Sequence, residues 1–439
     1  MNFKNFDIFD LNYEFSSKEF GIFDCGFDKA SLPKKGIVAR ILSLIFTCFF
    51  LLLKNKKKKK IIPKNSILFF GQYNNEKRPF YSILKKNNSY HIIGDDRYIN
   101  GFPILKIYLT SLLFIPIVLL HYFINKDKIK KLSFKYAFDF YCLSFAAILI
   151  VPKYLKKINP KKIFISNHTR PFQRIIMKLY SKRGLGYIQH ASFTNRMPPF
   201  EDFEYLLIDG KDSLNKLITT KSSNNNIFLI GNSMYDKFLS FTKINKDLKS
   251  IGICVNNNDY FDDIISVVKE IKSTYPSLKL FLRPHPSDPR FKKMKEFSFL
   301  NEIIFSNSRD TNSLEFLKNI DFLIAGDSNI HLESIFLNIP SIYLNFKGNK
   351  KDWYGFLKYK MLCNANSSTQ IIDILKTIDL KNLNIRQLAK PFNSSINTLY
   401  EGKSSSLALK IIHDNKSFIE NKFNRKIDTN NNYIYNLKE

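Results

Sequence analysis

Cysteine is scarce in this sequence and follows no spacing typical of a disulfide framework or a metal site. The 439 residues contain five cysteines and no CxxC pair. These scattered residues are Cys25, Cys48, Cys142, Cys254 and Cys363. Disulfide scaffolds and zinc sites need paired or closely spaced thiols. We therefore expect a reduced compartment and no zinc.

Several targeting and nucleic-acid signatures are also absent. The first 35 residues have no apolar h-region, so no cleavable signal peptide is predicted. No RRM, KH or zinc-finger signature is found, and we expect no nucleic-acid partner. Acidic residues are few, with 38 Asp and Glu against 68 Lys and Arg and a formal net charge of +30. This excess favours an anionic partner, although a biased base composition in the genome would also enrich Lys, Asn and Ile.

Long apolar runs are confined to the first third of the chain. Residues 36–53 read GIVARILSLIFTCFFLLL and lead into KNKKKKK, and residues 103–123 form a second run that contains one lysine and one internal proline. A spanning helix needs about 20 apolar residues, so both runs are borderline. The basic run fits anionic lipid on the cytoplasmic leaflet. We expect a cytoplasmic protein held peripherally on the inner face of the membrane; a true span and buried core helices are the alternatives.

From residue 66 onward, short apolar runs alternate with helical or loop stretches. The first series is 66–71, 161–166, 185–189, 203–210 and 226–231, and the second is 250–255, 279–283, 301–306, 321–326 and 341–345. Runs of this length between helical segments indicate parallel α/β sheets, and two series indicate two doubly wound domains. The predicted parts are an N-terminal extension (1–60), a first Rossmann-like domain (61–245), a second (246–385) and C-terminal helices and tail (386–439).

Unusual polar residues follow four of the predicted strands. The turns are NHTRP with Asn167, QHA, RPHP and GDSNIHLES. They hold four of the seven histidines, namely His168, His190, His285 and His331. In open α/β sheets the carboxyl ends of the strands carry the ligand crevice. The four turns are therefore expected to converge from both domains on one cleft.

Two of these turns have local features that point to a ligand. Arg283 and His285 each precede a proline, which makes both residues extended and holds the imidazole in a narrow range of directions. Asp327 or Ser328 is a predicted N-cap, and the first-turn N–H groups of the following helix form an anion site. Glu333 lies one turn into that helix, where its carboxylate is placed to accept hydrogen bonds from a ribose.

Together these motifs resemble bacterial surface-polysaccharide transferases of the GT-B fold. The RPHP turn, the GDS-x-x-x-x-E-S segment followed by NIPSIY, and the upstream QH turn are similar to capsule polysialyltransferases, Kdo transferases and CDP-glycerol glycerophosphotransferases of teichoic acid synthesis. The resemblance covers about residues 160–415 and includes IGNSMYD at 230–236 and YEGKSSSLALKII at 400–412. It implies a GT-B fold with two Rossmann-like domains that face a cleft.

The resemblance also implies roles for single residues. His285 resembles the residue that contacts the donor phosphate, Ser328 and Ser334 those that bind the phosphate or pyrimidine nucleotide, and Glu333 the ribose acceptor. His190 resembles the general base of the glycerophosphotransferases, although Ala191 stands where those enzymes have glycine. Asp209 and Gly210 partly match the acidic residue before glycine in the sialyltransferases. The base is therefore His190 or Asp209, with His190 preferred, and Asn167 and His168 are expected to bind the acceptor.

The predicted activity is inverting glycosyl transfer in capsule or lipopolysaccharide synthesis, from a CMP-activated sugar such as a nonulosonate or Kdo to a glycan or glycolipid. The base deprotonates the acceptor hydroxyl, and His285, Arg283 and helix N–H groups take up the leaving-group charge. No DxD motif occupies a plausible donor loop, so no metal and no cofactor beyond the nucleotide sugar are expected. The alternatives are a CDP-glycerol-type glycerophosphotransferase, an enzyme like UDP-N-acetylglucosamine 2-epimerase, and a non-enzymatic basic protein that binds membrane or nucleic acid.

Overall fold

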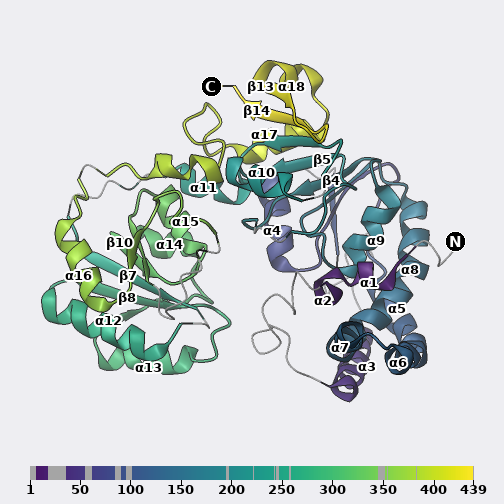
Figure 1. Cartoon of the computed structure of the whole chain (residues 1–439), viewed down its shortest axis with the longest axis horizontal. Helices are drawn as coiled ribbons and strands as arrows, with labels where there is room; N and C mark the ends of the chain where they lie inside the picture. Colours follow the sequence, from purple (N-terminus) through teal and green to yellow (C-terminus); the bar gives the residue numbers. More distant parts are fainter. Residues whose placement is uncertain are drawn as a thin grey trace. The chain divides into compact units, whose positions relative to one another are not determined.

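The chain forms two compact units, shown in Figure 1. The first unit consists of Met1–Asp209, Ser213–Met234 and Ala408–Lys438, and the second of Gly210–Asp212 and Tyr235–Leu407. The structure is a computed structural model. It describes residues 6–17, 36–54, 62–84, 90–94, 101–193, 197–220, 222–241, 243, 247–256, 259–344, 352, 354–381 and 383–438.

An eight-stranded sheet forms the centre of the first unit, with strand order β13-β14-β6-β5-β4-β3-β1-β2. Its strands are β1 (Ile67–Phe70), β2 (Tyr90–Ile93), β3 (Lys162–Ile165), β4 (Leu185–Ile188), β5 (Tyr205–Ile208), β6 (Asn226–Leu229), β13 (Phe423–Ile427) and β14 (Tyr433–Leu437). All neighbours pair in parallel except β13, which is antiparallel to β14. The carboxyl ends of β1 and β3 to β6 therefore lie at one edge of the sheet, which we call the carboxyl edge.

Helices pack around this sheet. They are α1 (Ile8–Leu11), α2 (Tyr13–Ser16), α3 (Ile37–Lys54), α4 (Asn74–Ile83), α5 (Ile104–Ser111), η2 (Leu112–Phe114), α6 (Ile115–Ile124), α7 (Lys128–Tyr136), α8 (Phe138–Ile158), α9 (Pro171–Tyr180), α10 (Lys211–Ile218) and α18 (Lys416–Lys422). The long helix α8 belongs to the core, since Tyr141, Ala147 and Val151 are completely buried. Leu11 and Phe15 join the same core. The described parts of the predicted N-terminal extension, residues 6–17 and 36–54, thus pack against the first unit.

The second unit has a six-stranded parallel sheet with strand order β12-β11-β10-β7-β8-β9. Its strands are β7 (Ser250–Val255), β8 (Lys279–Pro284), β9 (Ile304–Phe305), β10 (Phe322–Ala325), β11 (Ser341–Leu344) and β12 (Cys363–Ala365). Its helices are α11 (Asp236–Leu239), α12 (Phe261–Thr274), α13 (Phe291–Leu300), α14 (Ser313–Lys318), α15 (Ile330–Phe336), α16 (Ser368–Thr377) and η4 (Arg386–Phe392). The chain leaves the first unit within η3 (Ser233–Tyr235) and returns to it within α17 (Ser404–Ile412).

Local sequence explains these elements. All six residues of β7 are buried, as expected for a central parallel strand covered on both faces. In α12 the buried residues Ile264, Val267, Val268 and Ile271 recur at helical spacing, so one apolar stripe faces the sheet. Asp262 and Asp263 lie in the first turn of α12, where carboxylates favour the helix dipole.

Each of the ten predicted strands is present, with ends shifted by a few residues. Four further strands, β2, β12, β13 and β14, were not predicted. The hairpin β13–β14 lies in the segment expected to be helices and tail, and β14 pairs in parallel with β6. Residues 423–437 therefore form one edge of the sheet of the first unit, next to β6.

The apolar runs of the first third form helices. Two stretches, Ile104–Ile124 and Phe138–Ile158, are long and apolar enough to cross a membrane by length and composition alone. The second is mostly buried, as in a core helix, whereas few residues of the first are fully buried, and that stretch is divided into α5, η2 and α6. Residues 37–53 form a shorter apolar helix. The lysine run 56–60 lies outside the described residues.

Candidate functional site

His190 follows β4 at the carboxyl edge of the first sheet and is half-buried. Its Nδ1 atom is buried and has no hydrogen-bond partner among the residues that the structure describes. Burial lowers the pKa of His190, because a charged ring is poorly solvated there, and the nearby Glu76 carboxylate opposes this shift. His190 is therefore neutral at pH 7 and can accept a proton, as a general base must.

Glu76 is the residue at this edge that the sequence analysis missed. It lies in the first turn of α4, which follows β1, and is 1% exposed. Its carboxylate accepts hydrogen bonds from the backbone N–H groups of Gln72 and Tyr73 and from the side-chain amides of Asn167 and Gln173. Such a carboxylate is fixed in place and can stabilise an imidazolium that forms on His190 during reaction. Its position just after a predicted strand is the signal that could have identified it.

Asp209, the alternative base, directly follows β5 and is 5% exposed. Its Oδ2 atom accepts a hydrogen bond from the Asn232 amide at 3.2 Å. Its backbone N–H donates to Gln189 Oε1 at 2.9 Å, which links the loops after β4 and β5. The structure thus places both candidate bases at the same edge, with Asp209 the more deeply buried of the two.

Asn167 and His168 follow β3, but neither has the free polar surface expected of an acceptor-binding residue. Asn167 donates to Glu76 Oε1 at 2.8 Å and accepts from both the backbone N–H and the hydroxyl of Thr169. His168 is 1% exposed and packs against the rings of Tyr187 and Phe200. Burial lowers its pKa to about 3, so it is a neutral core histidine. The expected acceptor contact of His168 conflicts with this burial.

His285 follows β8 at the carboxyl edge of the second sheet and is exposed. Its backbone N–H donates to Val255 O at 2.7 Å, and the Ser287 backbone N–H donates to its Nδ1 atom at 3.3 Å. Because Nδ1 accepts, the proton of the neutral ring is on Nε2. Partial burial lowers the pKa of His285 while Asp288 opposes the shift. The ring is therefore a neutral hydrogen-bond donor at pH 7.

Arg283 has a different place from the one expected. It is 7% exposed, and its guanidinium donates to the Ser306 hydroxyl, the Thr311 hydroxyl and the Thr311 carbonyl at 2.8 to 3.0 Å. The predicted contact with leaving-group phosphate is not supported, because these bonds hold the loop after β9 to β8. Glu333 lies near this guanidinium, since its charge raises the pKa of Arg283 against the larger effect of burial.

A second cation, Arg309, stands beside the RPHP turn and was not predicted. It is exposed, and its Nε atom donates to Pro286 O at 3.0 Å. The Ser308 hydroxyl donates to Pro284 O at 2.5 Å and fixes the same loop. Both residues follow the predicted strand 301–306, so the rule that polar groups at strand ends bind ligands would have included them.

The GDS segment follows β10, but the predicted N-cap at Asp327 or Ser328 is wrong. Helix α15 begins at Ile330, and Asn329 is its N-cap with no side-chain capping bond. The Ser328 hydroxyl accepts only a long 3.4 Å bond from the Ile330 N–H, and Asp327 lies close to the Tyr343 hydroxyl. Both side chains are half-buried at the carboxyl edge. The Asn256 amide donates to Asp327 O at 3.2 Å and joins the loops after β7 and β10.

Two residues of α15 that share a motif have different environments. Glu333 is half-buried in the first turn. Ser334 is completely buried, and its hydroxyl donates to His331 O at 2.8 Å within the helix, which leaves the nucleotide role of Ser334 without support. His331 is also buried, between Ser341 Oγ and Gly326 O, and burial lowers its pKa to about 4.

Gly326 permits a close approach of the Asp259 side chain in the second unit. A Cβ atom at this position would lie 2.5 Å from Asp259 Oδ1. The same carboxylate accepts a 2.7 Å hydrogen bond from the Asn256 N–H, so it cannot move without breaking the loop after β7. We expect Gly326→Ala to lower the free energy of unfolding by about 1–3 kcal/mol, measured by urea denaturation.

A double-mutant cycle tests the cause of that loss. In an Asp259→Ala background the clash is absent, and Gly326→Ala should cost much less. An equal cost in both backgrounds would show that the Asp259 carboxylate is not what demands glycine.

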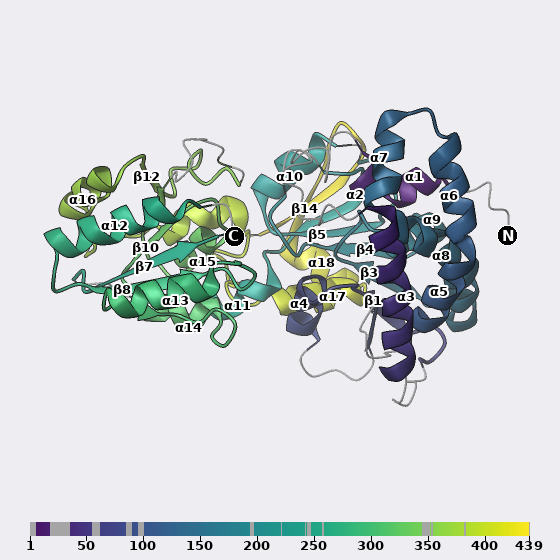
Figure 2. The same cartoon turned by 90° about the horizontal axis from the view of Figure 1, so that it is seen from below.

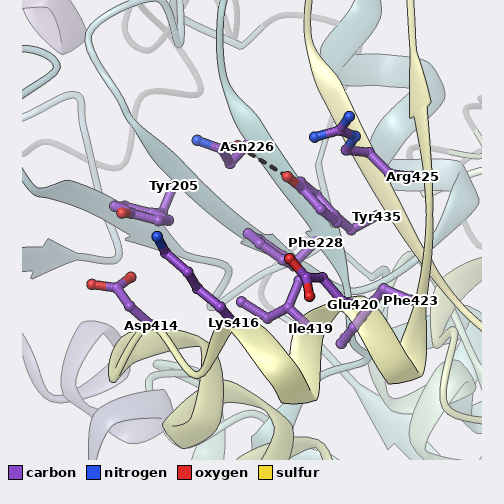
Figure 3. A pocket seen from close by; sticks show the side chains of 10 residues that line it. All are labelled: Tyr205, Asn226, Phe228, Asp414, Lys416, Ile419, Glu420, Phe423, Arg425 and Tyr435. Atoms are coloured by element: carbon purple, nitrogen blue, oxygen red, sulfur yellow. Dashed lines mark hydrogen bonds between the residues drawn. The ribbon is translucent and has the colours of Figure 1, made fainter.

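A cavity of the first unit lies away from this edge. It has a volume of about 710 Å³ and is lined by α18 and by residues of β5, β6 and β14 (Figure 3). Tyr205 and Asn226 are the first residues of β5 and β6, so the cavity lies at the amino ends of these parallel strands. Phe228 and Tyr435 stack in its wall with ring centroids 4.3 Å apart. His190 and Asp209 follow the carboxyl ends, and the cavity is therefore separate from the candidate site.

The described part of the chain contains no group of three or more His, Cys, Asp or Glu side chains that could hold a metal ion. The two sets of polar residues, one at the carboxyl edge of each sheet, are its candidate site. Their predicted convergence on one cleft stays a prediction.

Comparisons with solved structures identify the architecture. The S. aureus MnaA protein in its structure with UDP gives a TM-score of 0.52 at 14% identity, over 81% of this chain and 98% of that one. A UDP-N-acetylglucosamine 2-epimerase gives 0.50 at 12% identity, over 82% and 97%. The wall teichoic acid polymerase TagF, soaked with CDPG, gives 0.47 at 14% identity, over 87% and 96%. No family model and no curated protein matches the sequence.

These identities show the fold alone. The first two similarities, together with the two parallel sheets, confirm the expected α/β architecture: a GT-B fold of two Rossmann-like, doubly wound domains.

Proposed function

We propose that this protein is a nucleotide-sugar-dependent transferase of bacterial surface-polysaccharide synthesis. In this proposal the first unit supplies the base and the second unit binds the nucleotide. The observation that carries it is the placement of His190 and Glu76 at the carboxyl edge of the first sheet: a half-buried, neutral imidazole whose pKa is raised by the charge of a carboxylate fixed by four N–H donors. This pair suits the removal of a proton from an acceptor hydroxyl.

The reaction we propose is inverting transfer. His190 takes the proton of the acceptor hydroxyl, and the resulting oxygen nucleophile forms a bond to the anomeric carbon of the sugar. The bond from that carbon to the donor phosphate oxygen breaks, and its electron pair leaves with the nucleotide. The Glu76 carboxylate stabilises the imidazolium until the proton is released to solvent.

The second unit offers two groups for the leaving phosphate. The Nε2–H of His285 is a hydrogen-bond donor on an exposed turn, and Arg309 adds a positive charge beside that turn. Charge that develops on the phosphate is stabilised by such prearranged donors. Glu333, half-buried in α15, is the candidate ribose contact. The finer proposal, a CMP-activated sugar, rests on the resemblance of the RPHP and GDS segments.

A thermal-shift panel of CMP, CDP, UDP and GDP tests the nucleotide. A ligand at one hundred times its dissociation constant stabilises the native state by about 2.7 kcal/mol, so CMP or CDP should raise the melting temperature by several degrees. The expected turnover is release of the nucleotide from its sugar only when a glycan acceptor is present. Absence of any shift with all four nucleotides would contradict the proposal.

A UDP-N-acetylglucosamine 2-epimerase is the second candidate, because a protein of that name shares the fold over most of both chains. An epimerase needs no acceptor. Conversion of UDP-N-acetylglucosamine incubated alone with the protein would favour this candidate, whereas strict dependence on an acceptor favours the transferase.

A further inference from the structure

Helix α3 presents an apolar face to solvent. The exposed residues are Val38, Leu42, Ile45, Phe46, Phe49, Leu52 and Leu53, with exposed fractions between 46% and 72%. They recur at intervals of three and four residues, so they line one side of the helix. The outer side of a helix on a soluble protein is normally polar. A contiguous outward stripe of large apolar side chains therefore marks an interaction surface.

The other side of α3 is fixed to the first unit. Leu44, Cys48 and Leu51 are at most 5% exposed, and Cys48 Sγ lies 3.3 Å from Tyr108 O. Arg40 forms an ion pair with Asp139 of α8 at 3.6 Å. Figures 1 and 2 show α3 packed along the first unit, next to α7. These contacts place α3 along the first unit, and they favour a helix that lies on a bilayer surface over one that leaves the protein to cross it.

The apolar surface continues on the adjacent helices. Helix α3 packs beside α5, and the stretch α5–η2–α6 exposes Leu109, Leu113, Ile117, Leu120, Phe123 and Ile124. Leu113 is 75% exposed and Phe123 69%. We call these exposed residues of α3, α5, η2 and α6 the apolar face.

Positive charge predominates next to the apolar face in sequence. Helices α3, α5, η2 and α6 contain no Asp or Glu. The run Lys56–Lys60 follows α3, and α6 is followed by Lys126, Lys128 and Lys130, all three exposed. The one acidic residue among these three lysines, Asp127, is exposed and caps the N-terminus of α7. An apolar surface with basic neighbours complements an anionic lipid surface, where acyl chains accept the apolar side chains and headgroups attract the lysines. The excess of lysines over this single aspartate favours an anionic lipid surface over a neutral one.

We propose that the apolar face docks flat on an anionic lipid bilayer, with α3 lying in the interface between headgroups and acyl chains. The inference does not depend on the proposed activity. The lipid-binding residues then lie on one surface of the first unit, and the lysines that follow α3 and α6 attract the headgroups.

Vesicle flotation of the purified full-length protein tests this proposal. Vesicles of phosphatidylcholine mixed with phosphatidylglycerol should bind the protein, and vesicles of phosphatidylcholine alone should bind it much less. Phe46→Ser/Phe49→Ser should reduce the bound-to-free ratio on the mixed vesicles by about tenfold or more. High salt, or Lys126→Gln/Lys128→Gln, should reduce it partly, because exposed charges are screened.

The matched control is Phe299→Ser/Leu300→Ser, which removes an exposed phenylalanine and leucine from α13 of the second unit, 84% and 78% exposed. It should bind vesicles as the wild type does, and both double variants should keep the wild-type melting temperature. Equal losses in both variants, equal binding to neutral vesicles, or no binding by the wild type would overturn the proposal. So would a dimer in sizing experiments that Phe46→Ser/Phe49→Ser abolishes, or release from membranes only by detergent.

Discussion

Replacement of His190 by alanine should lower turnover by about 10²- to 10⁴-fold, the range that a positioned general base contributes. Nucleotide binding should not change, because the proposed nucleotide contacts belong to the second unit. The fold should also survive, since His190 is half-buried and its Nδ1 atom has no described hydrogen-bond partner to lose. Steady-state kinetics with saturating acceptor, together with a nucleotide thermal shift, measures both effects.

The matched control is His413→Ala, which removes an exposed histidine of the first unit far along the chain from the carboxyl-edge turns. It should keep wild-type turnover. Asp209→Asn should lose much less activity than His190→Ala, because Asp209 is more deeply buried and already accepts a bond from Asn232. Full activity in His190→Ala beside an inactive Asp209→Asn would reverse the assignment.

The pH profile provides an independent test of this base. A histidine base works when neutral, and burial lowers the pKa of His190 below its ordinary value of 6.5. The wild-type rate should therefore stay high as pH falls to that value and decline only below it. Glu76 raises the pKa of His190, so Glu76→Gln should move this acidic limb to still lower pH and also slow turnover. If the acidic limb of the pH–rate profile does not move in Glu76→Gln, then Glu76 does not act on the group that limits the rate at low pH.

Replacement of His285 by alanine should lower turnover by about a hundredfold, as loss of one donor to developing charge does. The exposed ring has few packing contacts to lose, so the melting temperature without nucleotide should stay the same. Unlike His190→Ala, this variant should also weaken nucleotide binding, because the Nε2–H is proposed to contact the donor phosphate. Isothermal titration with the nucleotide that gives the largest thermal shift distinguishes the two variants.

Acidic pH should strengthen nucleotide binding in the wild type and leave His285→Ala unaffected. Partial burial lowers the pKa of His285, so the ring becomes cationic only below pH 6.5 and then attracts the phosphate more strongly. Ser287→Ala is the mild control: it removes the hydroxyl that lies 2.8 Å from Nδ1 but keeps the backbone N–H that fixes the tautomer. Near wild-type turnover in His285→Ala would remove this residue from the proposed site.

The sequence alone determined the class of fold and the edge at which to look for function. Apolar runs of four to six residues are buried strands here, because a parallel strand covered on both faces has no polar side to present. The carboxyl-edge positions of His190 and His285 follow from the same runs, since a parallel sheet gathers the ends of its strands. The two flanking prolines restrict the local backbone of His285 and are visible in the sequence.

Long-range packing decided what sequence could not. Glu76 comes close to His190, and Asn167 donates to it, only because β1, β3 and β4 are neighbours in the sheet. His168 and His190 look alike as histidines after strands, yet aromatic rings enclose the first. Arg283 is held by Ser306 and Thr311, more than 20 residues later.

The strand β14 and the helix α3 show the same difference between what sequence predicts and what packing decides. The strand β14 was expected to be tail because its only parallel partner, β6, lies about 200 residues earlier. The apolar composition of α3 was visible in the sequence, but composition cannot tell a buried face from an exposed one. Only the packing of α3 against α5 and α8 shows that Leu44 is buried while Phe46 is exposed, because the helix has a single side that the rest of the unit can cover.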